Sequence, residues 1–202
     1  MQRQYTYIAL GDSYTIGEGV PLHQNFPYQL VQLLRKKGFA FAAPEIIAKT
    51  GWTTDELTAA LRKYSFSSNY DFATLLIGVN NQYRNREVIQ FTMKFEALLE
   101  KAMQLTGNKK NKVVVLTIPD YSITPFATDL DKKKIAKEID VYNAVIKAIC
   151  LQYKIHCLNI TESSRKAEKH PELLAPDGLH PSAKEYAKWA KKLAGILAKT
   201  LK

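Results

Sequence analysis

The sequence predicts an α/β fold in which a doubly wound parallel sheet is covered by helices on both faces. Two observations lead to this class. Short β-rich apolar runs recur along the chain, and longer segments with helical spacing of apolar residues separate them. Alternating strands and helices form crossover units, which place successive strands parallel in one sheet. We predict one domain over residues 1–202, because 202 residues with 46% hydrophobic content can bury a core of their own.

The predicted strands are apolar runs that end at polar or glycine-containing loops. They span Tyr5–Leu10, Pro44–Ala48, Phe72–Val79, Lys112–Ile118 and Ile155–Ile160. The predicted helices lie between and after these strands, and their apolar residues recur at helical spacing. They span Phe26–Lys37, Thr54–Tyr64, Glu87–Leu105, Lys132–Tyr153 and Ser182–Leu201.

Capping residues support two of the predicted helix starts. Thr53 precedes Glu56 by three residues, and Ser182 precedes Glu185 by three, so both pairs predict capping boxes. The stretches 119–131 and 162–180 show no clear period, and we predict long loops there. Ligands of open parallel sheets bind beyond the carboxyl ends of the strands. Residues that follow each predicted strand are therefore candidates for a site.

Composition excludes several classes of protein. Cys150 and Cys157 are too few for a disulfide scaffold, and no histidine pair has metal-ligand spacing. The apolar stretches fall far short of the roughly 18 residues of a bilayer helix. The net charge of +10 favours nucleic acid, but the lysines are spread along the chain without a nucleic-acid-binding motif. We expect no metal, no transmembrane segment and no specific nucleic-acid partner.

The amino terminus lacks the apolar region and cleavage site of a signal peptide. We therefore expect a cytoplasmic protein, although a leader that had been removed would leave the same sequence. A monomer is the default oligomeric state.

Ser13 follows the first predicted strand at a turn that Gly11 allows to be sharp. A serine there is a candidate nucleophile, and the alternative is that it only caps the turn. A serine nucleophile needs a base, and the base needs a third group that orients it. The turn from Asp177 to His180 offers both, because Gly178 lets the carboxylate reach the imidazole. A surface loop with an incidental histidine is the alternative.

Two further segments offer hydrogen-bond donors at strand ends. Asn80 follows Gly78 at the end of the third predicted strand, where its side-chain amide can donate to a developing oxyanion. Gly51 follows the second predicted strand. It can present its backbone N–H to the same oxyanion with no side chain in the way.

Taken in order, these four segments resemble the SGNH or GDSL hydrolases, a family named for Ser, Gly, Asn and His in four separated blocks. The matching residues are Ser13, Gly51, Asn80 and His180. The resemblance implies a flavodoxin-like three-layer α/β/α sandwich with a five-stranded parallel sheet. It further implies Ser13 as nucleophile, His180 as general base and then acid, and Asp177 as its orienting partner. The N–H groups of Ser13 and Gly51 and the Asn80 amide would form the oxyanion hole, with no cofactor.

The chain departs from the family pattern at one position. Where the family usually has an aspartate after the block asparagine, this chain has Asn81 after Asn80. A structural hydrogen bond that a carboxylate makes there must be made by an amide in this protein.

The residues and the resemblance together predict a serine esterase or acyl hydrolase that acts through an acyl-enzyme. The first expected substrate is a short-chain or acetyl ester, with an acetyl ester of a carbohydrate as the first choice. The alternatives are a lipid hydrolase of the lysophospholipase or thioesterase kind, and a carbohydrate-binding module without catalysis. Residues that follow the strand ends are expected to line the substrate pocket, namely Tyr14, Tyr83, Arg84, Tyr121 and Phe126.

Overall fold

The computed structural model describes residues 3–67 and 69–201. Its centre is a five-stranded parallel sheet with the order β2-β1-β3-β4-β5. The strands are β1 (Tyr7–Asp12), β2 (Glu45–Lys49), β3 (Phe72–Leu76), β4 (Val113–Leu116) and β5 (His156–Leu158). The predicted α/β class with five parallel strands is therefore confirmed.

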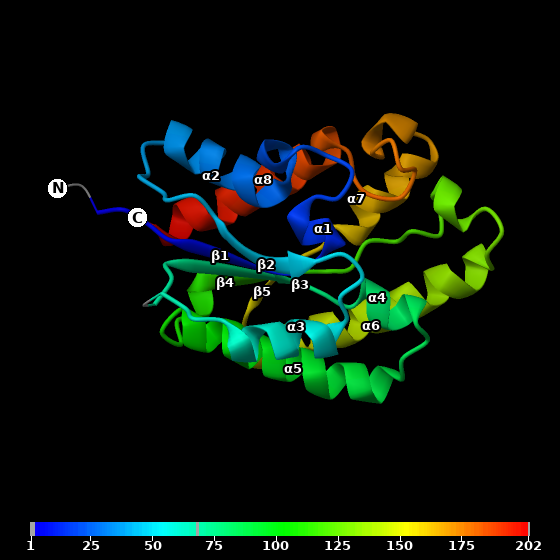
Figure 1. Ribbon diagram of the computed structural model, residues 1–202, viewed down its shortest axis with the longest axis horizontal. Coiled ribbons are helices and arrows are strands. Elements are labelled where there is room, and N and C mark those ends of the chain that lie inside the picture. The colour runs from blue at the N-terminus through cyan, green and yellow to red at the C-terminus, as the bar shows by residue number, and fades with distance from the viewer. Residues whose placement is uncertain (1–2, 68, 202) are drawn as a thin grey trace.

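Helices cover both faces of the sheet, which gives three layers (Figure 1). Above the sheet in that view lie α1 (Ser13–Ile16), α2 (Phe26–Lys36), α7 (Thr161–Arg165) and α8 (Ala183–Thr200). Below it lie α3 (Thr54–Lys63), α4 (Val79–Tyr83), α5 (Val88–Leu105) and α6 (Lys132–Tyr153). The five longer helices agree with the predicted ones to within two residues at each end.

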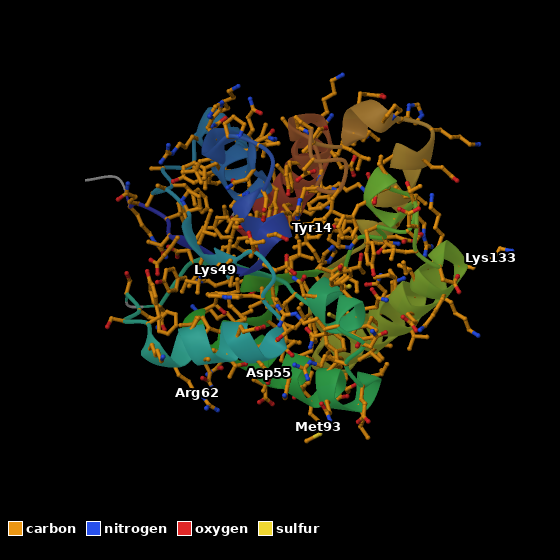
Figure 2. All side chains as sticks on the ribbon, turned by 45° about the vertical axis from the view of Figure 1, so that its right-hand side comes forward. Tyr14, Lys49, Asp55, Arg62, Met93 and Lys133 are labelled. Atoms are coloured by element: carbon orange, nitrogen blue, oxygen red, sulfur yellow. The ribbon has the colours of Figure 1, made fainter. Side chains whose placement is uncertain are left out.

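The core forms where the two helical layers meet the sheet. Leu10, Leu75 and Val115 are fully buried in the three central strands, as expected for strands covered on both faces. Phe95 on α5 and Trp189 on α8 are fully buried on opposite sides of the sheet. The outer helix surfaces are polar or exposed: in Figure 2, Arg62, Met93 and Lys133 point outward, whereas Tyr14 lies in the interior.

The third predicted strand is too long at its carboxyl end. β3 ends at Leu76, and α4 already begins at Val79. Between them Gly78 has φ +132°, and a Cβ there would lie 2.7 Å from the Phe91 ring. Only glycine fits, so the chain turns sharply from strand to helix at this point.

The stretch 162–180 also differs from its prediction as a loop. It contains most of α7 and two short 3₁₀ helices, η4 (Lys166–Glu168) and η5 (Pro171–Leu173). Further 3₁₀ turns are η1 (Leu22–Gln24), η2 (Lys110–Lys112) and η3 (Pro125–Ala127). Helices of one turn are too short to show an apolar period, which explains why the pattern does not reveal them.

One of the two predicted capping boxes is present. The Thr53 hydroxyl accepts from the N–H of Asp55, and the Glu56 carboxylate accepts from the N–H of Thr53 at 2.6 Å. The second prediction is wrong, because Ser182 makes no side-chain cap. Glu185 is buried instead and accepts a hydrogen bond from the Trp189 indole N–H at 2.8 Å. Because the buried indole N–H needs an acceptor, the Glu185 carboxylate bonds to it and does not cap the helix.

The strand order places a crevice at the carboxyl ends of β1 and β3. β1 lies between β2 and β3, so the connections that follow β1 and β3 leave toward opposite sides of the sheet. The same strand order creates a ligand-binding crevice in other doubly wound folds. Ser13 directly follows β1, and Asn80 follows β3 by four residues. No helix of the described residues is both long and apolar enough to cross a bilayer.

Candidate active site

Ser13 is the first residue of α1, directly after β1. Asp12 caps this helix, since its Oδ1 accepts from the N–H of Tyr14 at 3.0 Å. Gly11 is required, because a Cβ there would lie 2.1 Å from Thr15 Oγ1 and 2.4 Å from the Leu76 carbonyl oxygen. Helix starts leave N–H groups without helical partners, so Ser13 sits beside backbone donors.

Asp177 and His180 form a hydrogen-bonded pair in the turn before α8. Asp177 Oδ2 lies 2.7 Å from His180 Nδ1, and Asp177 Oδ1 accepts from the N–H groups of Leu179 and His180 at 3.0 and 2.9 Å. Partial burial works to raise the pKa of Asp177, but these bonds outweigh it and hold that pKa below its ordinary value. An ionised carboxylate on Nδ1 favours the tautomer that leaves Nε2 free to accept a proton.

One cavity of about 190 Å³ is lined by all of the predicted site residues except Asp177 and Arg84. It is lined by Ser13, Tyr14, Thr50, Gly51, Val79, Asn80, Tyr83, Tyr121, Phe126, Leu179 and His180. The Tyr14 ring packs on the imidazole, with 4.9 Å between ring centroids. Among the described residues, no hydrogen bond joins the Ser13 hydroxyl to His180. Catalytic hydrogen bonds often tighten only when substrate binds.

Asn80 and Gly51 both line this cavity. One N–H of the Asn80 amide donates to the Trp52 carbonyl at 3.0 Å, which orients the side chain and leaves its second N–H for a ligand. Gly51 has φ +79°, a conformation that suits glycine. Its loop and the start of α4 are thus held together at the ends of β2 and β3.

Arg84, predicted as a pocket residue, is not among the side chains that line the cavity. Its guanidinium donates to the Gly51 carbonyl at 2.6 Å and to Glu56 Oε1 at 2.8 Å. Arg84 therefore stabilises the loop that contains Gly51 without lining the cavity. The other four predicted pocket residues do line it. Sequence reasoning missed Thr50, Val79 and Leu179, although each is a direct neighbour of a predicted site residue.

Asn81 stands where the family usually has an aspartate, and its side chain makes two hydrogen bonds. Its Oδ1 accepts from the N–H of Thr54 at 3.0 Å, and its Nδ2 donates to the Thr54 hydroxyl at 2.9 Å. Both residues are buried. The amide thus ties α4 to the start of α3, the role that the departure from the family pattern requires of it.

The buried state of the Asp12 side chain could not be foreseen from the sequence. It is completely buried, and its second oxygen, Oδ2, has no hydrogen-bond partner among the described residues. Burial raises the pKa of Asp12 to about 7, against the smaller opposing effect of the Tyr14 N–H. The carboxyl next to the candidate nucleophile is therefore easily protonated.

This raised pKa makes folding stability depend on pH. In the unfolded chain an aspartate ionises near pH 4, so the stabilisation from neutral Asp12 is complete below that pH and lost as pH rises to about 7. We expect the free energy of unfolding to fall by a few kcal/mol relative to Asp12→Asn between pH 4 and 8, since one pKa unit is worth about 1.4 kcal/mol. Urea unfolding of both proteins measures this difference.

Asp131→Asn is the matched control, because Asp131 caps α6 in the same way but is exposed. Its stability relative to wild type should change little with pH. A constant difference between wild type and Asp12→Asn across this range would contradict the expectation.

Among the described residues, no group of three or more His, Cys, Asp or Glu side chains is placed to hold a metal ion. A serine at the end of β1, with a hydrogen-bonded Asp–His pair facing the same cavity, is typical of serine hydrolases. The chain belongs to the GDSL-like lipase/acylhydrolase family, whose model matches residues 9–188. As a member of this family, it is an ester-hydrolysing enzyme.

Solved structures share the fold at low sequence identity. A lipolytic protein of the G-D-S-L family from Veillonella parvula is 16% identical, with TM-score 0.73 and coverage of 97% of this chain and 99% of that one. The acetylxylan esterase of Geobacillus stearothermophilus is 17% identical, with TM-score 0.74 and coverage of 95% and 93%. A psychrotrophic esterase from Pseudoalteromonas sp. is 17% identical, with TM-score 0.67 and coverage of 97% and 98%. No curated protein matches the chain significantly in sequence.

Proposed function

We propose that this enzyme hydrolyses a short-chain carboxylic ester, such as an acetyl ester of a carbohydrate, through an acyl-enzyme on Ser13. One observation carries the proposal: the cavity that contains Ser13 is also lined by His180, itself bonded to Asp177, and by Gly51 and Asn80. Nucleophile, base and oxyanion donors thus meet around one small space. These are the groups that acyl transfer requires.

In the first half of the reaction, His180 Nε2 takes the proton of the Ser13 hydroxyl as its oxygen attacks the ester carbonyl. The N–H groups of Ser13 and Gly51 and the free N–H of Asn80 stabilise the negative oxygen that forms. Collapse breaks the bond to the alcohol, and His180 gives the proton to the leaving alcohol oxygen. Asp177 keeps the imidazole oriented and stabilises its charged form.

In the second half, His180 takes a proton from a water molecule whose oxygen attacks the acyl group on Ser13. The same donors hold the oxyanion, the acid leaves, and the proton returns to the Ser13 oxygen. Water supplies the hydroxyl of the acid, so the cycle needs no cofactor.

The size of the cavity supports a short acyl group. A volume of about 190 Å³ lies below the roughly 300 Å³ at which pockets for larger ligands begin. Four of its eleven lining residues are tyrosine or phenylalanine, and the rings of Tyr83, Tyr121 and Phe126 lie next to one another. The likeness in fold to an acetylxylan esterase is in accord with this choice.

A chain-length series tests the acyl group. For p-nitrophenyl esters from acetate to decanoate, kcat/KM is expected to fall at least tenfold beyond butyrate, because longer chains exceed the cavity. Rates that rose toward decanoate would contradict the short-chain proposal and favour a lipid substrate.

Covalent labelling tests the nucleophile. A serine-directed phosphonate is expected to modify Ser13 alone, because Ser13 lines the cavity together with His180, the base that takes the proton of its hydroxyl. Mass spectrometry of the digested protein locates the adduct. An adduct on Ser122 or Ser163, which do not line the cavity, would overturn the site.

A further inference from the structure

The Gly51 N–H is the one proposed oxyanion donor that belongs to a turn. Gly51 follows β2 with φ +79°, and glycine adopts φ values of either sign at little cost. The N–H of Trp52 donates to the Lys49 carbonyl at 3.2 Å and closes the turn. Turns closed in this way accept either sign of φ at the third residue, which is Gly51 here. The direction of the Gly51 N–H therefore depends on the groups that hold this turn.

The Arg84 guanidinium holds the carbonyl of the same glycine. Its Nη2 donates to the Gly51 carbonyl oxygen at 2.6 Å, and its Nη1 donates to Glu56 Oε1 at 2.8 Å. Rotation about the N–Cα bond of Gly51 moves its N–H relative to its carbonyl. A bound carbonyl therefore limits the directions that the N–H can take. Because the guanidinium is planar and two of its nitrogens have separate partners, its own orientation is fixed as well.

Glu56 holds both the guanidinium and the far end of the turn. Its Oε2 accepts from the N–H of Thr53 at 2.6 Å, while its Oε1 accepts from Arg84. Partial burial works to raise the pKa of Glu56, but the bonds from Thr53 and Arg84 outweigh it and lower that pKa to about 2. Glu56 is therefore ionised throughout the neutral range, and its bond to Arg84 persists there.

The helix α4 connects the two oxyanion donors that come from different strand ends. Asn80 lies on α4 and donates to the Trp52 carbonyl at 3.0 Å. Arg84 follows four residues later, on the same face, and binds the carbonyl next to it. The distance between the Asn80 amide and the Gly51 N–H is thus set by one short helix and two hydrogen bonds.

The Arg84–Glu56 pair acts through geometry rather than through charge. The two side chains are 41% and 40% exposed, and exposed ion pairs contribute little by their charges. The pair is also neutral as a whole. Arg84 does not line the cavity, so it has no direct contact with the reacting atoms.

We propose that Arg84, together with Glu56, is a positioning residue of this esterase, which fixes the Gly51 N–H at the distance from Asn80 that the oxyanion requires. The inference rests on the proposed function, in which Gly51 and Asn80 are oxyanion donors. It gives a consequence for the reaction rate to two residues that lie outside the cavity.

Arg84→Met tests the proposal, because methionine keeps an unbranched side chain but makes neither hydrogen bond. We expect kcat for p-nitrophenyl acetate to fall by about tenfold to a hundredfold. Removing one oxyanion donor costs about 10²–10³ in kcat, and a misplaced donor loses part of that. Both halves of the reaction form an oxyanion, so kcat falls whichever half limits the rate. KM should change less than twofold in steady-state kinetics.

Lys94→Met is the matched control. Lys94 is also 41% exposed and forms an ion pair with Asp55 on α3, but it does not line the cavity. It should keep wild-type kcat. Both variants should unfold at the urea concentration of the wild type, which shows that any loss of rate is not a loss of folded protein.

Two conservative variants test whether the pair acts as one unit. Arg84→Lys should give a kcat between those of the wild type and Arg84→Met, because an ammonium group lacks the planar fork that reaches both partners. Glu56→Gln should also lower kcat. Adding it to Arg84→Met should cause no further loss, since residues in one network are not additive. If Arg84→Met does not fold, these two variants decide.

The pH profile separates positioning of the loop from damage to the Asp–His pair. The ratio of wild-type to Arg84→Met kcat should stay constant from pH 6 to pH 9, because Glu56 is ionised throughout and guanidinium groups do not deprotonate in proteins. A disturbed Asp–His pair would instead give a ratio that changes with pH, as expected for Asp177→Asn.

An inhibitor that resembles the transition state tests the oxyanion donors directly. In a trifluoromethyl ketone, the carbonyl carbon accepts the Ser13 oxygen while His180 takes the serine proton. The former carbonyl oxygen then carries the negative charge among the oxyanion donors. The inhibition constant should weaken in Arg84→Met by the same factor as kcat/KM.

This inference and the proposed function fail in different ways. Ser13-dependent hydrolysis with wild-type kcat in Arg84→Met would overturn the inference alone, as would an equal loss in Lys94→Met or unchanged inhibition by the ketone. Absence of any Ser13-dependent hydrolysis would refute the proposed function. Hydrogen exchange of the Trp52 N–H, followed by NMR, then still tests the positioning: it should be at least tenfold faster in Arg84→Met than in Lys94→Met, and equal rates would overturn it.

Discussion

Replacing Ser13 with alanine is expected to lower kcat for p-nitrophenyl acetate by at least a thousandfold, with little change in the free energy of unfolding. The cavity contains no other serine, so no second nucleophile replaces it. Removal of the serine from a triad generally costs several powers of ten in kcat. Steady-state kinetics and urea unfolding of the same preparation measure the two quantities.

Ser163→Ala serves as the matched control. Ser163 is also buried, on α7, but it does not line the catalytic cavity. It should keep wild-type kcat. The assignment of Ser13 would fail if Ser13→Ala retained more than about a thousandth of wild-type kcat while folding normally.

Asp177→Asn is expected to reduce kcat/KM by about a thousandfold or more at pH 7 and to recover part of it at high pH. The substitution keeps the shape of the side chain, but an amide N–H opposite Nδ1 favours the wrong tautomer of His180, and comparable changes in other triads cost about 10⁴ in kcat. The carboxylate, with its lowered pKa, is ionised throughout the neutral range. Kinetics from pH 6 to pH 10 follow the loss and recovery.

Asp129→Asn is the control, because Asp129 is exposed and does not line the cavity. Near wild-type kcat/KM for Asp177→Asn at pH 7 would remove Asp177 from the catalytic machinery. A backbone carbonyl would then be the group that orients His180.

The strands and long helices could be predicted because each buries a regular apolar pattern. Leu75 in β3 and Phe95 in α5 belong to such patterns. The residues that meet in the cavity could be predicted because parallel strands end at one edge. Ser13 and Asn80 follow neighbouring strands of the sheet for this reason.

The role of Arg84 could not be predicted from the sequence. The apolar run before α4 continues into Val79, so the start of this short helix is indistinguishable from the end of a strand. With α4 starting at Val79, Asn80 and Arg84 are four residues apart on one helix face. Both side chains therefore reach the same loop, one the carbonyl of Trp52 and the other that of Gly51. A strand extending to Val79 would have placed them differently.

The unpaired oxygen of Asp12 and the bond between Gln82 and Glu138 also lie beyond sequence reasoning. Each depends on which groups pack around a buried side chain, and those groups come from distant segments. Glu138, the partner of the Gln82 amide, is 56 residues away in the chain. Local patterns of polarity carry no information on such pairings.

The segment between β4 and α6 contributes to the wall of the cavity but not to the catalytic groups, so substrate specificity could be engineered there. It supplies Tyr121 and Phe126 to the cavity wall but none of the groups assigned to proton transfer or oxyanion binding. Exchanging it between relatives should therefore redirect specificity on an intact catalytic framework. Pro125 limits which segments can be exchanged, because its ring packs next to Gly178. A Cβ on Gly178 would lie 3.4 Å from that ring. A donor segment that lacks this contact would loosen the turn of the Asp–His pair along with the wall.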